Sequence, residues 1–296
     1  MLLFMKNKIR TLLIDLGLSS ADSFSEFYPK IRDYDGISVL KCSKSGVLLL
    51  SRTDHLDEEY YVTQKGYSYW ASNRTEAIAK VTMEDTNRRY NQFNYLIRNK
   101  KWLDVGTGPG DILEKMGSLA NKVIAVEPQT DVRNNLKEMK WDVYPFVKDV
   151  PESDFDIATV FLVLQQLFDP ITELKNIKNK LIPGGKIIVE VNNANDFLFS
   201  QLNLESFKSY AFQKSVLMFH TRISLKTFLE TAGFKNIIIQ GVQRYPLSNH
   251  LYWLSKGEPG GHNIWSHLRN PELDSAYLNL LSSLDQTDTL IAIAEV

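Results

Sequence analysis

A glycine-rich turn between two apolar strands constrains the fold of this chain more than any other segment. Residues 102–111 read WLDVGTGPGD, with glycines at 106, 108 and 110, and Asp104 stands two residues before the first of them. A second aliphatic run, 123–126, ends on Glu127. Glycine permits a tight turn and lets the backbone approach a ligand closely. The order strand, glycine turn, helix, strand and acid is typical of the nucleotide-binding half of a doubly wound α/β sheet.

The spacing of the glycines separates two classes of nucleotide-binding protein. In a dinucleotide-binding turn the third glycine follows the second by three residues, where a helix N-terminus meets a pyrophosphate. Here the third glycine follows by two, and Asp104 would repel a pyrophosphate but suits a cation. We therefore favour a cationic nucleotide ligand over NAD(P). A turn without any ligand is the least favoured interpretation, because three glycines and a strand-end acid are a costly way to build a plain loop.

The segment resembles the first motif of the class I S-adenosylmethionine (SAM)-dependent methyltransferases. The resemblance covers about 100–240 and returns at 288–296, with further matching motifs at 155–157, 181–185 and 232–234. It implies SAM as the cofactor, with Asp104 at the amino end of the methionine moiety and Glu127 on the ribose hydroxyls. Asp149 would lie near the adenine amine and Phe161 at the methyl-donor end. The implied cofactor-binding residues are Asp104, Gly106, Thr107, Gly108, Gly110, Glu127, Pro128, Asp149 and Phe161.

Strand and helix patterns alternate regularly after residue 100. Strands are predicted at 102–105, 123–127, 142–146, 155–161, 186–191, 236–240 and 289–294. Helices are predicted at 111–119, near 130–138, from Asp169-Pro170 to about 181, and from Ser224 as cap to Gly233. This alternation predicts a doubly wound, mostly parallel seven-stranded sheet, class α/β, with helices on both faces. The resemblance implies that the last strand is antiparallel.

Two parts of the chain are distinguished. Residues 1–80 form an N-terminal α+β region, with a helix over about 5–17 and a hairpin from 37–40 and 46–50. The hairpin resembles the zinc knuckle that precedes some bacterial sugar methyltransferase domains. However, Ser45 stands where the knuckle has its second cysteine and Cys42 is the sole cysteine, so we expect no metal site and a buried Cys42. The resemblance implies that residues 81–296 form the SAM-binding domain, with insertions near 192–222 and 243–287.

The acceptor side is less well defined by the sequence. The insertion at 243–287 is interpreted as a substrate lid, with an oligomer contact as the alternative. A hydroxyl nucleophile needs a proton acceptor of near-neutral pKa, and histidine is the usual choice. Our catalytic candidates are His250, His262 and His220, each of which could instead be structural. The candidate substrate-binding residues are Asn192, Asn193, Arg244, Tyr245 and Asn249. A helix over 83–98 carries Arg88 and Arg89, for which solvent exposure is favoured over contact with an anionic substrate.

Composition and resemblance together give the expected function. The net charge of −1 gives no support for nucleic-acid binding through bulk charge, and no apolar run is long enough to cross a bilayer. One cysteine suits a reducing cytoplasm. We expect O-methylation of a small polar acceptor, with a homodimer possible; by resemblance, that acceptor is a sugar or nucleotide-linked sugar of surface polysaccharide biosynthesis. N- or C-methylation stays open. The alternative from another class is a non-catalytic SAM-fold partner protein, which the pair Gln165-Gln166 favours because related enzymes carry Glu-His there. A dehydrogenase ranks third.

Overall fold

The structure is a computed structural model that describes residues 7–56, 58–63 and 76–296. Its main element is a seven-stranded sheet in the order β10-β11-β8-β7-β4-β5-β6. The strands are β4 (Lys101–Val105), β5 (Lys122–Val126), β6 (Val143–Tyr144), β7 (Phe155–Phe161), β8 (Leu181–Asn192), β10 (Lys235–Val242) and β11 (Thr289–Glu295). Strands β6, β5, β4, β7 and β8 are parallel, whereas β11 runs antiparallel to both β8 and β10. The predicted doubly wound sheet with an antiparallel last strand is confirmed.

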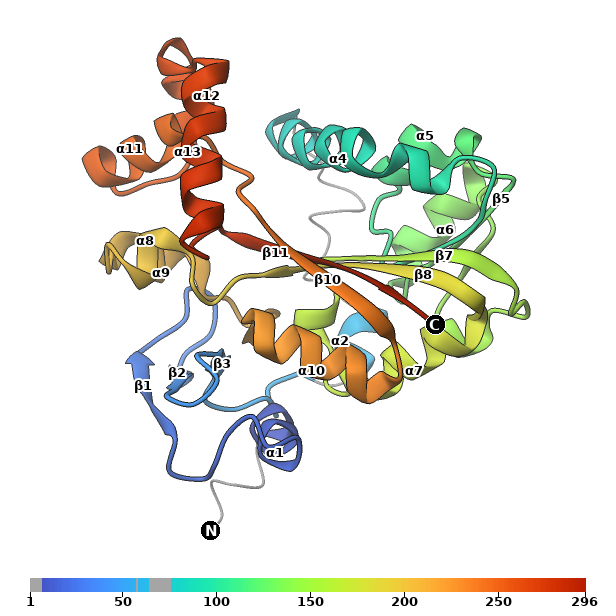
Figure 1. Cartoon of the computed structure of the whole chain (residues 1–296), viewed down its shortest axis with the longest axis horizontal. Coiled ribbons are helices and arrows are strands. Elements are labelled where there is room, and N and C mark those ends of the chain that lie inside the picture. Colours follow the sequence, from blue (N-terminus) through green and yellow to red (C-terminus); the bar gives the residue numbers. More distant parts are fainter. Residues whose placement is uncertain (1–6, 57, 64–75) are drawn as a thin grey trace.

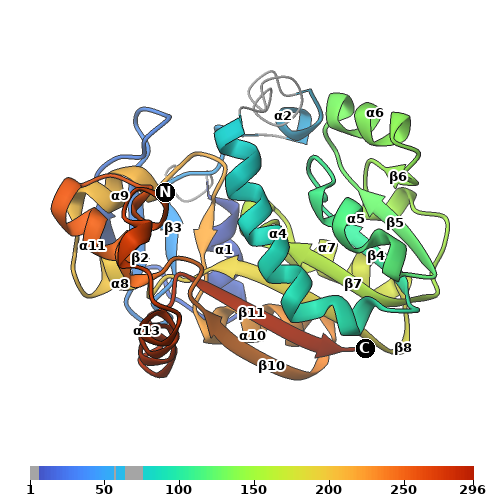
Figure 2. The ribbon, with the colours of Figure 1, turned by 90° about the horizontal axis from the view of Figure 1, so that it is seen from above.

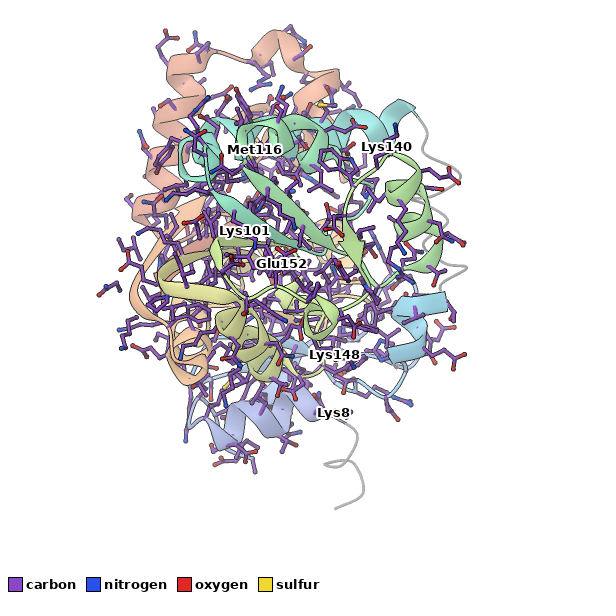
Figure 3. All side chains as sticks on the ribbon, turned by 90° about the vertical axis from the view of Figure 1, so that its right-hand side faces the viewer. Lys8, Lys101, Met116, Lys140, Lys148 and Glu152 are labelled. Carbon is purple, nitrogen blue, oxygen red and sulfur yellow. The ribbon has the colours of Figure 1, made fainter. Side chains whose placement is uncertain are left out.

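The direction of the strands defines two edges of the sheet. The carboxyl ends of β4, β5, β7 and β8 lie on one edge, which we call the carboxyl edge. Because β11 is antiparallel, its first residue, Thr289, reaches this edge opposite Asn192 of β8 and Val242 of β10. The opposite edge carries ion pairs, such as Lys101 with Glu152 at 2.6 Å (Figure 3). Loops that follow β4, β5, β7, β8 and β10 therefore converge at the carboxyl edge.

Helices cover both faces of the sheet (Figure 1). One face carries α4 (Glu76–Ile97), α5 (Asp111–Met116) and α6 (Thr130–Glu138), whose apolar residues pack with Trp102 and Ile188 in one buried cluster. The other face carries α7 (Pro170–Lys180) and α10 (Arg222–Ala232), which pack with Leu103 and Val189 in a second cluster. Neighbouring residues of one strand enter opposite clusters because side chains alternate across a sheet. Burial on both faces explains why inner strands such as β4, β7 and β11 read as nearly continuous apolar runs.

The predicted helix ends are partly confirmed. Asp169 caps α7 by accepting a hydrogen bond from the Thr172 N–H at 3.1 Å, with Pro170 in the first turn. Gly233 ends α10 with a left-handed φ of 90°. The start of α10 differs from the prediction: Thr221 is the N-cap, and Ser224 completes a capping box from the third helical position. Both residues are good caps, and the local pattern did not distinguish them.

The N-terminal region forms a second, antiparallel sheet. Its strands are β1 (Phe24–Tyr28), β2 (Val39–Cys42), β3 (Leu48–Leu50) and β9 (Met218–Phe219), preceded by α1 (Lys8–Asp15) and followed by α2 (Glu58–Thr63). The first residues of the helix expected over 5–17 lie outside the described residues, as do residues 64–75 near the predicted boundary. Strand β9 comes from the insertion after β8, so the two sheets are joined through that insertion. Cys42 is buried, with its Sγ 3.4 Å from the Ser23 hydroxyl.

The two insertions are helical. The first contains α8 (Phe197–Ser200) and α9 (Glu205–Ala211) besides β9. The second, which we call the helical arm (243–287), contains α11 (Leu247–Lys256), α12 (Gly261–Ile264) and α13 (Pro271–Ser283). The arm projects from the body of the molecule beside the carboxyl edge, and α4 lies across that edge between the arm and α5 (Figures 1 and 2). The described residues also contain the short 3₁₀ turns η3 (Gly117–Leu119), η4 (Val147–Asp149), η5 (Leu164–Gln166) and η6 (Ser266–Leu268).

Candidate active site

The glycine turn leaves β4 and reaches across to β5. The N–H groups of Gly106 and Thr107 both donate to the Val126 carbonyl, at 2.8 and 3.2 Å. Gly106 has φ 76°, and a Cβ there would stand 2.2 Å from Val163 Cγ2. Gly108 has φ 57°, but a Cβ there would meet no atom within 4 Å. Gly106 is thus required by packing, whereas Gly108 leaves its backbone open to a ligand. Gly110, with φ 91°, is the N-cap of α5.

Glu127 is bound to the turn by backbone hydrogen bonds. Its Oε2 accepts from the Gly108 N–H at 3.0 Å, and its Oε1 accepts from the Gln129 N–H at 2.9 Å. Burial raises the pKa of Glu127 to about 7. Arg133 Nη1 donates to the carbonyls of Glu127 and Pro128, at 2.9 and 2.7 Å. The acid at the tip of β5 is therefore fixed beside the open glycine of the turn.

Asp104 is buried in the last part of β4. The Thr159 hydroxyl donates to its Oδ1, and Trp102 Nε1 donates to that same hydroxyl at 2.7 Å. Among the described residues, Asp104 Oδ2 and Thr107 Oγ1 are buried without a well-formed hydrogen bond. Burial raises the pKa of Asp104. A buried carboxylate oxygen with unused capacity is unfavourable alone and suits a cationic or hydrogen-bonding ligand group.

Two of the expected cofactor-binding residues, Phe161 and Asp149, lie outside the glycine turn. Phe161, the last residue of β7, stacks on Phe93 of α4, with the ring centroids 5.9 Å apart. The Arg89 guanidinium also lies over the Phe161 ring, 4.7 Å from its centroid. Asp149 is exposed at the end of η4. Phe161 thus belongs to the wall between β7 and α4, whereas Asp149 stands at the surface.

A network of buried ion pairs joins α4 to β8. Glu190, fully buried in β8, accepts from Arg88 Nη2 at 2.7 Å and from Arg89 Nε at 2.9 Å. Although burial opposes ionisation, the two guanidinium groups hold the pKa of Glu190 below its ordinary value. The expectation of solvated arginines at 88 and 89 is therefore wrong. Their partner lies 101 and 102 residues away in the chain, and helical periodicity cannot reveal such a contact.

The network continues into the helical arm through Arg244. Its Nη1 lies 3.4 Å from Asp85 of α4, and its Nε lies 3.4 Å from Asp288, which precedes β11. Although burial favours the neutral acid, Arg244 and then Arg89 and Arg88 lower the pKa of Asp85 to about 2. Arg244 is thus a structural link between α4 and the start of β11. Sequence reasoning missed the three acids Asp85, Asp288 and Glu190. Of these, only Glu190 had a local signal in the sequence, because it is an acid inside an apolar strand.

The three candidate histidines are all engaged in the described structure. The Gln243 amide donates to His250 Nε2 at 3.1 Å, and Nδ1 lies 2.7 Å from the Tyr277 hydroxyl. Burial lowers the pKa of His250 to about 4. Burial also lowers the pKa of His220 to about 3, and its Nδ1 lies 3.2 Å from the Ser224 hydroxyl. Neither ring is arranged as the proton acceptor that we expected from the sequence.

His262 belongs to the contact between the arm and α4. Its Nδ1 lies 3.2 Å from Asn249 Oδ1, and its Nε2 lies 2.7 Å from Asn263 Nδ2 and 3.4 Å from Glu84 Oε2. Tyr245 packs on the same ring, with centroids 5.1 Å apart, and burial raises the pKa of Tyr245 to about 12. His262, Asn249 and Tyr245 are therefore brought together, as neighbours within the arm.

The two asparagines after β8 differ in their surroundings. Asn193 is fully buried: its Nδ2 donates to the Thr287 carbonyl at 2.8 Å, and its Oδ1 accepts from the Asn195 N–H at 3.0 Å. Its side chain is committed to the backbone. Asn192 is half-buried at the carboxyl edge, opposite Thr289. Of the two, Asn192 is the better placed to face a ligand.

The residues of the glycine turn fit SAM on the geometry of this structure. Asp104 offers a buried carboxylate oxygen for the ammonium group. Gly108 offers backbone that no side chain covers, and the Glu127 carboxylate stands next to it for the two ribose hydroxyls. The site contains carboxylates where a pyrophosphate-binding turn would need positive charge. This arrangement defines a nucleotide-binding α/β protein for a cationic, phosphate-free ligand.

Comparisons with known proteins give the same class. A family model described as a methyltransferase domain matches residues 70–238, so the chain belongs to this methyltransferase family. A ubiquinone biosynthesis O-methyltransferase of Coxiella burnetii is 27% identical over 180 residues, which cover 54% of this chain and 74% of that protein. A tRNA U34 carboxymethyltransferase of Vibrio cholerae is 29% identical over 156 residues, 48% of this chain and 47% of that protein. A SAM-dependent methyltransferase of Archaeoglobus fulgidus shares the fold, with TM-score 0.52, 18% identity and coverage of 79% and 100% of the two chains.

The chain is a SAM-dependent methyltransferase, and SAM is its cofactor. The family model includes the glycine turn, Glu127 and the strands up to β10. Residues 7–56, 58–63 and 76–296 contain no helix long and apolar enough to cross a membrane.

Proposed function

We propose that this methyltransferase transfers the methyl group of SAM to a hydroxyl oxygen of a small polar acceptor at the carboxyl edge. The observation that carries the proposal is the convergence of Asp104, Gly108 and Glu127 at the carboxyl ends of β4 and β5, next to β7. When bound, SAM supplies a methyl group activated by its sulfonium. Asp104 would hold the ammonium group, Gly108 would admit the nucleoside, and Glu127 would accept from the ribose hydroxyls.

The acceptor would lie beside β8, between α4 and the helical arm. Polar and charged groups reach this region, among them Asn192, Arg244 and Asp288. Polar walls of this kind match an acceptor that carries hydroxyl groups. In this proposal the arm acts as the lid, and its contacts with α4 through Arg244 and His262 hold the two sides of the site together. Alignment of acceptor and cofactor is then the main contribution of the protein to rate.

Proton acceptance from the hydroxyl is assigned in this proposal to Asp196 rather than to a histidine. Asp196 follows β8 and is buried, with Oδ1 accepting from the Leu198 N–H at 2.8 Å. Burial, with Asp288 as the next cause, raises the pKa of Asp196 to about 8. Within the described part of the chain no group donates a hydrogen bond to its Oδ2. A carboxyl group with such a pKa can accept a proton at mildly alkaline pH.

Three lines support O-methylation over other acceptor atoms. One matched relative is named an O-methyltransferase. The polar residues at the carboxyl edge suit a hydroxyl acceptor, and Asp196 supplies a base. Sugars and nucleotide-linked sugars belong to the acceptor panel, together with phenolic hydroxyl compounds.

The test is a screen with methyl-labelled SAM against that panel at pH 7 and pH 9. We expect label in one hydroxyl compound, faster transfer at pH 9, and loss of that increase in Asp196→Asn. Transfer to an amine or a carbon would replace the O-methylation proposal. Cofactor binding without transfer to any compound would favour the second candidate, a non-catalytic SAM-binding partner protein. A homodimer stays a prediction, to be checked by light scattering of the purified chain.

A further inference from the structure

Hydrogen bonds within the helical arm fix the direction in which the Tyr277 hydroxyl donates. Gln243 Oε1 accepts from the Asp288 N–H at 3.0 Å, and Gln243 Nε2 donates to the Tyr245 carbonyl at 3.1 Å. These two backbone groups allow one orientation of the amide, in which the same Nε2 faces His250 Nε2 at 3.1 Å. Because an amide nitrogen can only donate, His250 Nε2 is the acceptor and carries no proton.

The proton of the His250 imidazole is therefore on Nδ1. Burial lowers the pKa of His250 to about 4, so the ring is neutral and has a single N–H near pH 7. Nδ1 lies 2.7 Å from the Tyr277 hydroxyl oxygen, to which it donates. Since the hydroxyl oxygen accepts this bond, its own proton is directed to another group. Within residues 7–56, 58–63 and 76–296 nothing accepts that proton.

Packing around the imidazole holds Asp196 near the same hydroxyl. Phe197, the residue after Asp196, stacks on the His250 ring with the centroids 6.1 Å apart. Tyr277 packs edge-on against that ring at 5.5 Å. Burial, followed by the charge of Asp196, raises the pKa of Tyr277 to about 12, so the hydroxyl keeps its proton. No hydrogen bond joins Tyr277 to Asp196 in the described structure, so together they present one donor, the Tyr277 O–H, and one acceptor, Asp196 Oδ2.

We propose that Tyr277 and Asp196 together bind the hydroxyl group that is methylated, with Tyr277 donating to its oxygen and Asp196 accepting its proton. The inference rests on the proposed function, in which Asp196 is the base. On transfer, the hydroxyl proton passes to Asp196 Oδ2, the oxygen forms its bond to the methyl carbon, and the electron pair of the broken C–S bond stays on sulfur. Tyr277 keeps its own proton and stabilises the negative charge that develops on the oxygen. Gln243 and His250 are positioning residues, because they act through Tyr277.

The two groups select the acceptor by its hydrogen-bonding pattern. A hydroxyl accepts one bond and donates another through a single atom, as Tyr277 and Asp196 require. An ammonium group can only donate. A carboxylate can only accept, and ionised Asp196 would repel it. The methyl ether product can no longer donate to Asp196, so we expect it to bind less tightly than the acceptor. The site therefore suits a neutral hydroxyl compound.

The tautomer of His250 is the first measurement. Two-bond proton–nitrogen correlation NMR of the full chain, labelled in its histidine rings, reports which ring nitrogen carries the proton, and His250→Asn assigns the signal. We expect the Nδ1-protonated form at pH 7. The Nε2-protonated form would overturn the inference, because the Tyr277 hydroxyl would then donate to His250 and have no proton for an acceptor.

A binding experiment separates this role of Tyr277 from a role in folding. Benzyl alcohol can accept from Tyr277, whereas benzylamine, an ammonium ion at pH 8, can only donate. Both are titrated, by saturation-transfer NMR, into the full chain loaded with S-adenosylhomocysteine. Tyr277→Phe should weaken the binding of benzyl alcohol by about 3- to 10-fold and leave that of benzylamine within about twofold of wild type. Tyr252→Phe is the matched control: it removes a hydroxyl of the same arm, which donates to Glu258 at 3.0 Å, and should change neither affinity.

Equal weakening of both probes in Tyr277→Phe would overturn the inference, since Tyr277 would then act through the fold of the arm. Unchanged affinity of this variant for benzyl alcohol, or no binding of benzyl alcohol by wild type, would overturn it as well. If benzyl alcohol binds as expected but no hydroxyl compound takes label in the screen, the O-methylation proposal fails, whereas the binding of a hydroxyl by Tyr277 and Asp196 is supported.

Discussion

Glu127 shows at the scale of a single residue how the chain prepares a ribose site. Its two oxygens accept backbone hydrogen bonds on either side of the turn, yet burial keeps its pKa at about 7. A carboxyl group whose pKa is raised by folding destabilises the folded state when it ionises. The ionised Glu127 carboxylate therefore lowers the stability of the folded state, but it can accept hydrogen bonds from a ligand.

The first prediction concerns how the destabilisation by ionised Glu127 depends on pH. The Glu127 pKa rises from 4.5 to about 7 on folding, so its unfavourable contribution is absent below pH 4.5 and complete above about pH 7. It amounts to about 3 kcal/mol of unfolding free energy. Urea unfolding of wild type and Glu127→Gln at pH 5 and pH 8 should show wild type losing stability relative to the variant as pH rises. A difference that is constant across this range would contradict the prediction.

The second prediction separates two glycines of the turn. In Gly106→Ala the new Cβ would clash with Val163 at a left-handed φ, so we expect a loss of about 3 kcal/mol or more of unfolding free energy. In Gly108→Ala only the strain of the left-handed φ remains, about 1–2 kcal/mol, but the ligand approach is blocked. Chemical denaturation and SAM titration measure both. Unchanged SAM binding in Gly108→Ala would show that the cofactor does not approach this residue.

At the scale of elements, the polar side of α4 makes ion pairs with β8 and with the helical arm. Asp85 meets Arg244, and Arg88 and Arg89 meet Glu190. On its apolar side, Phe93 packs in the same cluster as α5. Removal of one partner from a buried pair leaves the other charge uncompensated, which costs more than the net value of the pair.

The third prediction follows from the lowered pKa of Asp85. Folding lowers it from 3.8 to about 2, so the ion pair contributes fully above about pH 4 and is lost as pH falls toward 2. The contribution is about 2 kcal/mol. Asp85→Asn should therefore be less stable than wild type at pH 7, with a smaller gap at pH 3. Asp15→Asn, at an exposed position of α1, serves as the control and should change stability little at either pH. A gap for Asp85→Asn that does not narrow in acid would rule out this role.

At the scale of the whole molecule, the N-terminal sheet and the central sheet share one apolar core. Phe212, fully buried in the insertion after β8, packs against Phe27 of β1, with centroids 6.1 Å apart, and against Phe219 of β9 at 5.4 Å. Strand β9 pairs with β3. The two sheets therefore depend on each other for burial.

The fourth prediction is that both sheets unfold together. Phe212→Ala should cost about 3–5 kcal/mol, as expected for a large aromatic side chain removed from a core. Thermal unfolding followed by calorimetry should remain one transition that moves to lower temperature. Two separated transitions in wild type would show that residues 1–80 fold as an independent domain.

Local patterns account for what could be predicted from the sequence. The glycine turn, the apolar strands and the caps near Asp169 and Gly233 are each encoded within a few residues, and they predicted the seven-stranded sheet. The pairing of β3 with β9 and the ion pairs of Arg88 and Arg89 join residues more than 100 positions apart. Such contacts depend on topology, and one sequence gives no periodic signal for them. The histidines were predicted to be proton acceptors because a free imidazole has a near-neutral pKa, and burial changes that pKa.

Calorimetric titration with S-adenosylhomocysteine, the product form of the cofactor, tests the central claim most directly. Wild type and Glu127→Ala are compared at pH 8, where Glu127 is mostly ionised, after circular dichroism has shown both to be folded. The account predicts binding in the micromolar range for wild type and a loss of at least about tenfold in the variant, because the ribose hydroxyls lose their acceptor. Equal affinity of the two proteins, or no binding by folded wild type, would contradict the placement of the cofactor between Asp104, Gly108 and Glu127.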